Sequence, residues 1–291
     1  MAAPPGRRTD HGLVDDYELI DVGAGARLER FGSRLVDRTH PGAYGDRGDP
    51  EAWAAATLFH VPGEGWQGPE AASPWTIGLH GLTVELRPTD TGQLGVFPEQ
   101  ASSWEWLEQQ VKDRTAGEPA PAMLNLFAYT GVSTLVAAAA GASVAHVDAS
   151  KPAVAWARRN AELSGLADRP IRWLVDDAPA FVARELRRGR TYDGVILDPP
   201  SYGHGSRGRA WRLEDDLEIL LASCARLVRD RRGFVLLTAH TPEYGPEKLA
   251  AALGRAGRIP VARIEAGELA LDARTGRRLE LGAFARWPGG A

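Results

Sequence analysis

Hydrophobic and polar residues alternate in blocks through the middle of the chain, and the block lengths predict strands and helices in turn. An apolar run over residues 123–127 is short enough to be a strand buried on both faces. Gly131 follows it and allows a tight turn, because a residue without Cβ accepts positive φ. Small apolar residues at 132–140 then predict a helix, and residues 142–147 predict a second strand that ends on Asp148. This order is the first half of a nucleotide-binding βαβ unit.

The same alternation continues toward the C-terminus. Further strands are predicted at residues 171–175, 192–197, 234–238, 261–265 and 279–286, and helices at 151–163, 179–188, 213–228 and 246–253. Strands that alternate with helices form a parallel sheet with helices on both faces, here with a paired ending that can be antiparallel. Asp148, Asp177 and Asp198 each follow a predicted strand. Because the carboxyl ends of parallel strands meet at the ligand-binding edge of such a sheet, we expect these three acids to lie there together.

The first part of the chain has a different pattern, with short strands divided by glycine turns. Strands are predicted at residues 16–20, 27–31, 33–36, 75–79 and 82–88, whereas residues 40–68 are rich in Pro and Gly. We interpret residues 13–93 as a small β-rich domain. It follows a tail at residues 1–12 that we expect to be disordered, and it precedes a second domain at residues 94–291.

The two predicted domains are joined by the segment LGVFPEQASSWEWLE. Ser102 or Ser103 can cap a helix that begins at Trp104. Phe97 and Gln100 precede that cap, so this part either folds over a ligand or is a linker with a buried Phe. The residues themselves leave both interpretations open.

The turn after the first strand of the second domain favours a ligand without phosphates. It reads Ala128-Tyr129-Thr130-Gly131-Val132-Ser133 and has one glycine, whereas close approach to a pyrophosphate favours the three-glycine fingerprint. By spacing alone, NAD-type, adenosyl-type and purely structural βαβ units remain open, and S-adenosylmethionine is a ligand without phosphates. Asp148 is placed for two ribose hydroxyls, with a helix N-cap as the alternative. Asp177, or Asp176 beside it, can accept from an adenine amino group, with the amide of Ala178 facing the ring.

The run Asp198-Pro199-Pro200-Ser201-Tyr202 follows the fourth predicted strand of the second domain and is the sharpest signal in the chain. Two prolines fix an extended backbone and remove two donors, so that the carbonyls there can face a planar amine. Tyr202 offers a ring for stacking, and Asp198 lies where a nucleophile would meet a methyl donor. We therefore take Asp198, Pro199, Pro200 and Tyr202 as the catalytic candidates.

From Leu94 onward the chain resembles the class I S-adenosylmethionine-dependent methyltransferases. The resemblance rests on five motifs, which read GVFPEQ, NLFAYTG, HVDASK, DDA and DPPSYG. Within that class the chain resembles the bacterial 23S (large-subunit) rRNA methyltransferases related to the carbon-5 cytosine enzymes. The resemblance implies a Rossmann-like α/β sheet of seven strands, the last one antiparallel, and S-adenosyl-L-methionine as cofactor. It also implies a cofactor site lined by Asn125, Phe127, Tyr129, Gly131, Asp148, Ala149, Asp177 and Asp198, which Phe97 and Gln100 reach from the connecting segment.

One departure from that group concerns its cysteine nucleophile, which lies just after the fifth strand. Here that stretch reads Leu237-Thr238-Ala239-His240-Thr241, and Cys224 lies in a predicted helix among leucines, where a core position is the better interpretation. We therefore expect direct attack by a nitrogen or oxygen nucleophile on the sulfonium methyl, without a covalent cysteine adduct. His240 either takes the proton or is structural.

Composition changes this picture little. The chain has 291 residues, of which 44% are hydrophobic and 25% charged, ordinary values for one large domain or for a sheet domain with a smaller one. A single cysteine excludes an internal disulfide framework and a cysteine-rich metal site, and we expect no metal. We find no apolar run of membrane-spanning length and no apolar signal segment in the first twelve residues, so we expect a cytoplasmic protein without a membrane partner.

Charge is uneven and bears on the substrate. Residues 1–95 carry 8 basic and 14 acidic residues, and residues 96–291 carry 26 and 24, for a formal net charge of −4. The excess of acidic residues in the first third of the chain disfavours binding of this part to the phosphate backbone of a nucleic acid. Arginines nevertheless cluster at residues 184–190 and 207–212, and Tyr202 and Trp211 can stack on a displaced base.

Our leading hypothesis is an enzyme that methylates a nucleobase nitrogen in RNA, with rRNA as the first candidate partner. The alternatives are a methyltransferase for a small molecule or a protein side chain and a non-catalytic protein that binds an adenosyl ligand. The sequence leaves the oligomeric state open.

Overall fold

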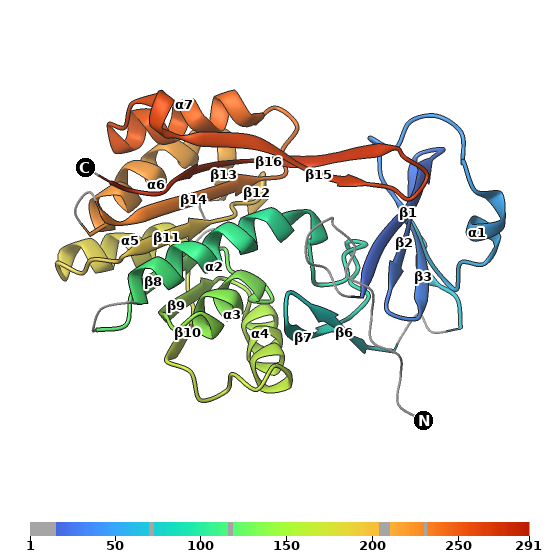
Figure 1. Cartoon of the computed structure of the whole chain (residues 1–291), viewed down its shortest axis with the longest axis horizontal. Coiled ribbons are helices and arrows are strands. Elements are labelled where there is room, and N and C mark those ends of the chain that lie inside the picture. The colour runs from blue at the N-terminus through green and yellow to red at the C-terminus, as the bar shows by residue number, and fades with distance from the viewer. Residues whose placement is uncertain (1–15, 70–72, 116–118, 204–209, 230–231, 291) are drawn as a thin grey trace. The chain divides into compact units, whose positions relative to one another are not determined.

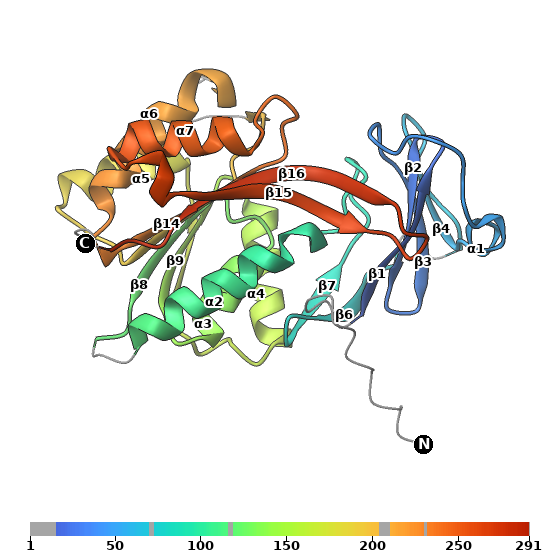
Figure 2. The ribbon, with the colours of Figure 1, turned by 45° about the horizontal axis from the view of Figure 1, so that its top comes forward.

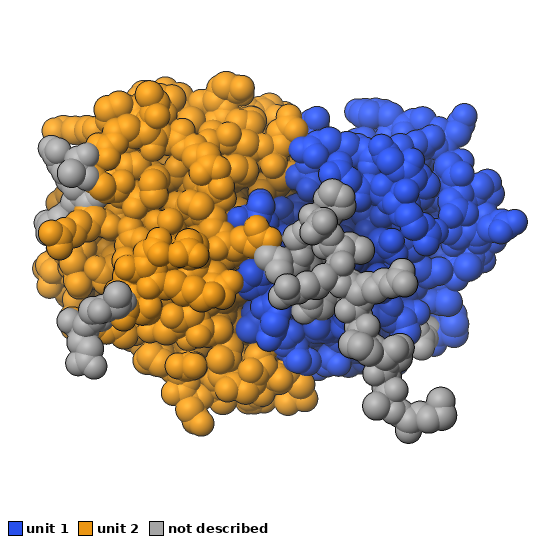
Figure 3. Space-filling model, viewed as in Figure 1, with its two compact units in different colours: residues 1–102, 270–280 blue, residues 103–269, 281–291 orange. Residues whose placement is uncertain are grey.

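The chain folds into two compact units. The computed structural model describes residues 16–69, 73–115, 119–203, 210–229 and 232–290, so the predicted tail at residues 1–12 lies outside the described residues. One unit comprises residues 1–102 and 270–280, and the other comprises residues 103–269 and 281–291 (Figure 3). We call them unit 1 and unit 2. The domain boundary drawn from the sequence, between residues 93 and 94, stays a prediction.

Unit 2 is built on a seven-stranded sheet with the order β10-β9-β8-β11-β14-β16-β15. Its strands are β8 (Ala122–Leu126), β9 (Ser143–Asp148), β10 (Ile171–Val175), β11 (Gly194–Leu197), β14 (Phe234–Ala239), β15 (Glu265–Asp272) and β16 (Arg278–Trp287). The first five strands in that order are parallel, and β16 runs antiparallel to β14. The predicted α/β fold class, a Rossmann-like sheet of seven strands with an antiparallel ending, is confirmed.

Helices cover both faces of this sheet. They are α2 (Ala101–Thr115), α3 (Val132–Ala139), α4 (Lys151–Leu163), α5 (Ala178–Arg187), α6 (Leu213–Leu227) and α7 (Pro246–Gly257). In both views α5, α6 and α7 lie on one side of the sheet and α2, α3 and α4 on the other (Figures 1 and 2). Every residue of β11 and of β14 is buried, as expected for central strands between two helical layers. Of the helices that the structure describes, none has the length and apolar character needed to cross a membrane.

The register of the parallel strands brings their carboxyl ends to one edge. Leu126 at the end of β8 pairs with Val147 of β9 and with Leu197 at the end of β11. On the outer side, Val175 at the end of β10 pairs with Asp148 at the end of β9. The strand order reverses at β8, because β9 lies on one side of it and β11 on the other. Such a reversal opens a crevice beyond the carboxyl ends, where ligands bind in open α/β sheets.

Unit 1 contains a five-stranded sheet with the order β1-β2-β3-β4-β5 and a separate β6–β7 hairpin. The elements are β1 (Tyr17–Gly23), β2 (Ala26–Phe31), β3 (Arg34–Thr39), α1 (Pro50–Ala54), β4 (Leu58–Val61), β5 (Gly65–Gln67), β6 (Trp75–Leu79) and β7 (Leu82–Leu86). A fully buried Glu29 accepts hydrogen bonds from Tyr17 (2.9 Å) and Arg38 (2.7 Å) inside this unit. Residues 270–280 belong to the same unit, where Thr275 donates to Asp21 (2.9 Å).

Three sequence predictions of local structure are wrong. The helix predicted to start at Trp104 begins at Ala101, because the 3₁₀ turn Pro98–Gln100 runs directly into α2. Neither Ser102 nor Ser103 is therefore a cap. The strand predicted at residues 261–265 is instead the 3₁₀ turn Val261–Arg263, and β15 starts only at Glu265.

The Pro- and Gly-rich stretch at residues 40–68 contains α1, β4 and β5, which the sequence did not predict. The start of α1 did carry a readable signal. Asp49 caps it by accepting from the amide of Ala52 (3.0 Å), and Pro50 occupies the first helical position.

Candidate functional site

The loop after β8 has an unusual backbone. Phe127 and Tyr129 have φ angles of 55° and 48°, values that residues with a Cβ seldom adopt. Gly131 follows with φ 87° and caps α3, and a Cβ added there would lie 2.9 Å from the Cβ of Ala157 in α4. The glycine is therefore required both by its conformation and by the close approach of the helix. Two strained residues beside a required glycine are typical of a ligand-binding loop.

Asp148 holds this loop from the end of β9. Its Oδ2 accepts from the amide of Tyr129 (2.8 Å) and its Oδ1 from the amide of Ser150 (2.8 Å). Burial raises the pKa of the Asp148 carboxyl, and the two backbone hydrogen bonds act in the opposite direction. A carboxylate has about four acceptor positions, so two further donors can be bound by the same side chain. Ala149 next to it is exposed.

A buried polar network that the sequence did not reveal lies behind the loop. The amide of Asn125 in β8 donates to the hydroxyl of Thr134 in α3 (2.9 Å), and that hydroxyl contacts Nδ1 of His146 in β9 (2.9 Å). Burial lowers the pKa of His146 to about 3, so the imidazole is neutral at physiological pH. Asn125 is 3% exposed, and its side chain ties the start of α3 to the sheet. Its predicted contact with the cofactor stays a prediction.

The two aspartates after β10 have different partners. Asp176 forms an ion pair with Arg184 of α5. Asp177 caps α5 by accepting from the amide of Ala180 (2.9 Å), while Ala178 begins the helix and is buried. The choice between Asp176 and Asp177 as the adenine partner stays open.

Val175, the last residue of β10, is a surface feature that the sequence analysis missed. Val175 is 53% exposed. It lies at the carboxyl end of a parallel strand, the edge at which ligands bind in open α/β sheets. The residue lies directly before the two aspartates, and it offers an apolar surface at the same edge. No local pattern signals this exposure, because Val is a common strand residue.

Asp198 lies at the end of β11 between two side chains from β14 and the segment after it. Its Oδ1 accepts from the hydroxyl of Thr238 (2.7 Å) and lies 3.5 Å from Nε2 of His240. The other ring nitrogen of His240 is 2.9 Å from the carbonyl oxygen of Leu281, which fixes Nδ1 as the donor. Burial disfavours the carboxylate, but the charge and hydrogen bond of His240 and the hydrogen bond of Thr238 hold the pKa of Asp198 below its ordinary value. Asp198 is therefore an ionised acceptor near neutral pH.

The carbonyl of the second proline already has one partner. The indole nitrogen of Trp211 donates to the carbonyl of Pro200 (2.8 Å), which leaves this oxygen one further acceptor position. The predicted role of the proline pair stays a prediction. Trp211 is 5% exposed and its ring centroid lies 5.0 Å from that of Phe127. The prediction that Trp211 stacks on a base is therefore wrong, because its ring is part of the core.

Tyr202 keeps the surface position that stacking needs. It lies in the short strand β12 (Tyr202–Gly203), which pairs with β13 (Trp211–Arg212), and it is 57% exposed. Pro199 is buried and Pro200 exposed. Residues 204–209, with the arginines of the predicted 207–212 cluster except Arg212, lie outside the described residues.

Cys224 is 1% exposed in α6, and burial raises the pKa of its thiol. Its interpretation as a core residue is confirmed. Phe97 and Gln100 belong to unit 1, where Gln100 is buried, and their predicted contact with the cofactor stays a prediction. Within the described part of the chain, no cluster of three or more His, Cys, Asp or Glu side chains is arranged to hold a metal ion.

Comparison with known proteins agrees with this geometry. Residues 62–265 match the family described as S-adenosylmethionine-dependent methyltransferase. The crystal structure of the SAM-dependent methyltransferase from Agrobacterium tumefaciens superimposes with a TM-score of 0.86 and 37% sequence identity. That match covers 94% of this chain and 90% of the other.

Two curated relatives are named as ribosomal RNA enzymes. The ribosomal RNA large subunit methyltransferase K/L of Magnetococcus marinus is 32% identical over 155 residues, which are 52% of this chain and 20% of that protein. The ribosomal RNA large subunit methyltransferase I of Pseudoalteromonas translucida is 30% identical over 158 residues, 54% of this chain and 38% of that protein. The chain thus spans well under half the length of these relatives.

The family match covers more than half of the chain, and the Agrobacterium structure matches nearly all of it. The family's shared ligand is S-adenosylmethionine, which has no phosphate group and so agrees with the single-glycine loop. The chain belongs to the S-adenosylmethionine-dependent methyltransferase family.

Proposed function

We propose that this protein methylates a nitrogen of a nucleobase in RNA, with ribosomal RNA as the first candidate, by direct transfer without a covalent cysteine adduct. Two curated relatives are named as methyltransferases of large-subunit ribosomal RNA, which supports the substrate class. The observation that carries the proposal is Asp198, an ionised acceptor at the carboxyl edge of the sheet in the same run as the exposed ring of Tyr202.

The residues at this edge fit S-adenosylmethionine. Asp148 has acceptor positions left for the two ribose hydroxyls after binding the amides of Tyr129 and Ser150. Gly131 lets the loop and α4 approach closely, and the exposed side chain of Val175 can lie against the adenine. None of these groups needs a phosphate as partner, which agrees with a ligand that has none.

When bound, S-adenosylmethionine supplies a methyl group on a positively charged sulfur. The nitrogen of the substrate forms a bond to this carbon as the carbon–sulfur bond breaks. Asp198 accepts a hydrogen bond from the attacking amine, which orients the nitrogen lone pair and stabilises the positive charge that develops on it. The side chain of Asp198 is 29% exposed, so the proton that the nitrogen loses has a route through the carboxylate to water.

His240 and Thr238 act through Asp198 in this proposal. They hold the carboxylate ionised, and the hydrogen bond from His240 to the carbonyl of Leu281 fixes the orientation of its ring. We therefore assign them as positioning residues. Tyr202 offers its exposed ring for stacking on the base beside the reacting atom.

The position of the chain's single cysteine supports a reaction without a covalent cysteine step. Attack on a pyrimidine ring needs an accessible thiolate, and Cys224 is buried in α6 with a raised pKa. A nitrogen nucleophile needs no such adduct, because its own lone pair attacks the methyl group.

The test is methyl transfer to defined RNA. We would incubate the protein with isotope-labelled S-adenosylmethionine and with ribosomal RNA from a strain that lacks the gene, digest the RNA to nucleosides, and identify the labelled product by mass spectrometry. The proposal predicts a nucleoside methylated on nitrogen. A 5-methylcytidine product would contradict the chemistry, and label that enters only protein or metabolite fractions would contradict the substrate.

Salt provides a second readout of the substrate class. Because RNA binding releases counterions, its affinity should fall steeply as the salt concentration rises. A turnover that responds little to salt between about 50 and 200 mM would favour a small-molecule substrate instead.

A further inference from the structure

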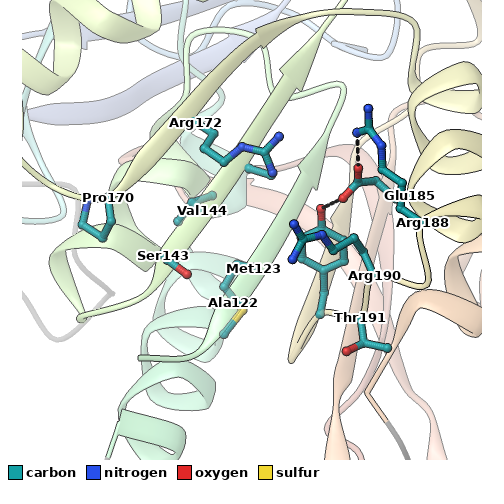
Figure 4. A pocket seen from close by; sticks show the side chains of 12 residues that line it. Ala122, Met123, Ser143, Val144, Pro170, Arg172, Glu185, Arg188, Arg190 and Thr191 are labelled. Carbon is teal, nitrogen blue, oxygen red and sulfur yellow. Dashed lines mark hydrogen bonds and ion pairs between the residues drawn. The ribbon is translucent and has the colours of Figure 1, made fainter. Parts of the chain in front are cut away.

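A pocket lies at the opposite edge of the same sheet, at the amino ends of its parallel strands. Its volume is about 430 Å³. It is lined by Ala122, Met123, Ser143, Val144, Ala145, Pro170, Arg172, Glu185, Arg188, Arg190, Thr191 and Tyr192 (Figure 4). We call it the amino-edge pocket. A five-residue strand is about 15 Å long, so the pocket is separated from the carboxyl edge by roughly the length of β8.

The single carboxylate among the lining residues is already paired. Glu185 is 1% exposed and accepts from the hydroxyl of Tyr192 (2.7 Å) and from the guanidinium of Arg188 (3.0 Å). The charge of Glu185 is thus balanced by Arg188. It does not neutralise the other two arginines of the pocket.

Arg172 and Arg190 carry the uncompensated charge. Arg172 is the second residue of β10 and Arg190 follows the end of α5, so two separate elements bring them together. Neither side chain forms a hydrogen bond or ion pair with a residue that the structure describes. Figure 4 shows both guanidinium groups over the same hollow. The charges of both also oppose the rise in the pKa of Tyr192 that burial and Glu185 cause, which agrees with their closeness to its hydroxyl.

Helix capping explains only part of this cluster. Basic residues after a helix interact favourably with the carbonyls of its last turn, and the amides of Arg188 and Arg190 both donate to the carbonyl of Glu185 (3.1 Å each). Arg172 lies in a strand and has no such role. Both arginines line the pocket without a partner among the described residues, so their guanidinium groups are available to a ligand.

We propose that the amino-edge pocket binds the phosphate group of a phosphorylated ligand. Two free guanidinium groups match the charge of a phosphomonoester, which is about −1.5 to −2 at neutral pH. Their planar forks suit phosphate oxygens, which accept two parallel hydrogen bonds from one arginine. Met123, Val144 and Pro170 are the larger apolar residues among the lining, beside which the organic part of the ligand can lie. The volume lies within the range of about 300–1,000 Å³ common for small-molecule sites.

This inference does not depend on the proposed function, because none of the lining residues takes part in the carboxyl-edge site. The phosphate can come from a free nucleotide or from an RNA strand. The test therefore includes both sources.

Isothermal titration calorimetry of the full chain tests the proposal with three probes: inorganic phosphate, uridine 5′-monophosphate, and a short single-stranded RNA without terminal phosphates. The key variant carries Arg172→Gln and Arg190→Gln, which remove the two free charges from exposed side chains. The matched control is Arg158→Gln, an exposed arginine of α4 outside the pocket. Binding of S-adenosylhomocysteine reports whether each variant is folded, and Arg172→Gln alone replaces the double variant if that one fails to fold.

We expect the wild type and Arg158→Gln to bind uridine 5′-monophosphate alike and the double variant to bind it at least about tenfold more weakly. If only the RNA binds and shows the same dependence on the two arginines, the phosphate belongs to an RNA strand and the site still stands. The proposal is overturned if the wild type binds none of the three probes at millimolar concentration. It is also overturned if the double variant binds them as the wild type does, or if Arg158→Gln weakens binding equally.

Discussion

The two edges of the seven-stranded sheet carry opposite charge. The carboxyl edge has Asp148, Asp176, Asp177 and Asp198, each at or just after the end of a strand. The amino edge has Arg172, Arg188 and Arg190 around a pocket whose single carboxylate is paired. The same parallel strands therefore present two different kinds of site, separated by the length of a strand.

The two edges are also built differently. At the carboxyl edge the backbone itself is specialised, with Phe127 and Tyr129 at positive φ and Gly131 against α4. Asp148 holds this backbone through the amides of Tyr129 and Ser150. At the amino edge, charged side chains make the site, from the strand β10 and from the segment after α5. Substitutions at the carboxyl edge should therefore affect chemistry and cofactor binding, whereas those at the amino edge should affect stability or a separate ligand.

The largest effect is expected for Asp198→Asn. This change keeps the shape of the side chain and removes the charge that stabilises the reacting nitrogen, so kcat should fall about 10²–10³-fold. Affinity for S-adenosylhomocysteine, measured by calorimetry, should stay within a few fold. A variant that retains full turnover would remove Asp198 from the reaction, and one that loses only cofactor affinity would make it a binding residue.

Asp148→Ala should act on the cofactor rather than on the reaction. Two charge-assisted hydrogen bonds to the ribose, each worth about 1.5–3 kcal/mol, are lost, so the Kd for S-adenosylhomocysteine should rise about 100-fold or more. The control is Asp168→Ala, an exposed aspartate of unit 2 away from the crevice. Equal affinity of the Asp148 variant and the control would show that the ribose lies elsewhere.

Tyr192→Phe tests the amino edge by stability. The change leaves one oxygen of the buried Glu185 without its hydrogen bond, which should cost about 1–3 kcal/mol of unfolding free energy in urea titrations. Turnover and cofactor affinity of the folded variant should not change, because Tyr192 lies at the other edge. A large loss of kcat without a loss of stability would mean that the two edges are coupled.

His240→Asn should change the pH dependence of turnover more than the maximal turnover rate. His240 lowers the pKa of Asp198, so without it burial dominates and that pKa rises. The ionised carboxylate is the active form, and activity is lost as the pH falls through its pKa. The acid limb of the kcat/KM profile should therefore move to higher pH, while Asn keeps a donor for the carbonyl of Leu281. If the acid limb of the profile stays at the same pH, the titrating group is not Asp198.

Much of the carboxyl edge could be predicted from the sequence because local patterns determine it. The apolar run before Gly131, the acid at 148 and the run from Asp198 to Tyr202 each lie within a few residues of a strand end. Parallel strands then bring them together without further information. What the local pattern could not supply was the partner of each group. The indole of Trp211 donates to the carbonyl of Pro200, and only the fold shows that the Trp211 ring lies in the core.

The amino edge could not be predicted for the same reason. Arg172 alone, an exposed residue of a strand, has the pattern of an ordinary solvated side chain, and Arg190 has the pattern of a helix end. Their significance arises from tertiary packing, which places them over one pocket. The pair Asp198 and His240 is a similar case. The two residues are far apart in the sequence, and they come together because β11 and β14, which they follow, are neighbours in the sheet.

Cys224 gives the smallest expected effect and belongs to neither edge. Cys224→Ser should leave kcat and cofactor affinity within about twofold of the wild type, because a buried thiol in α6 touches no reacting group. The hydroxyl enters an apolar environment, so the free energy of unfolding should fall by about 1–3 kcal/mol. Cys224→Ala separates the two effects, since it removes the polar atom and keeps the site apolar. A variant that is stable and folded but inactive would revive a covalent route through this cysteine and would overturn the assignment of chemistry to Asp198.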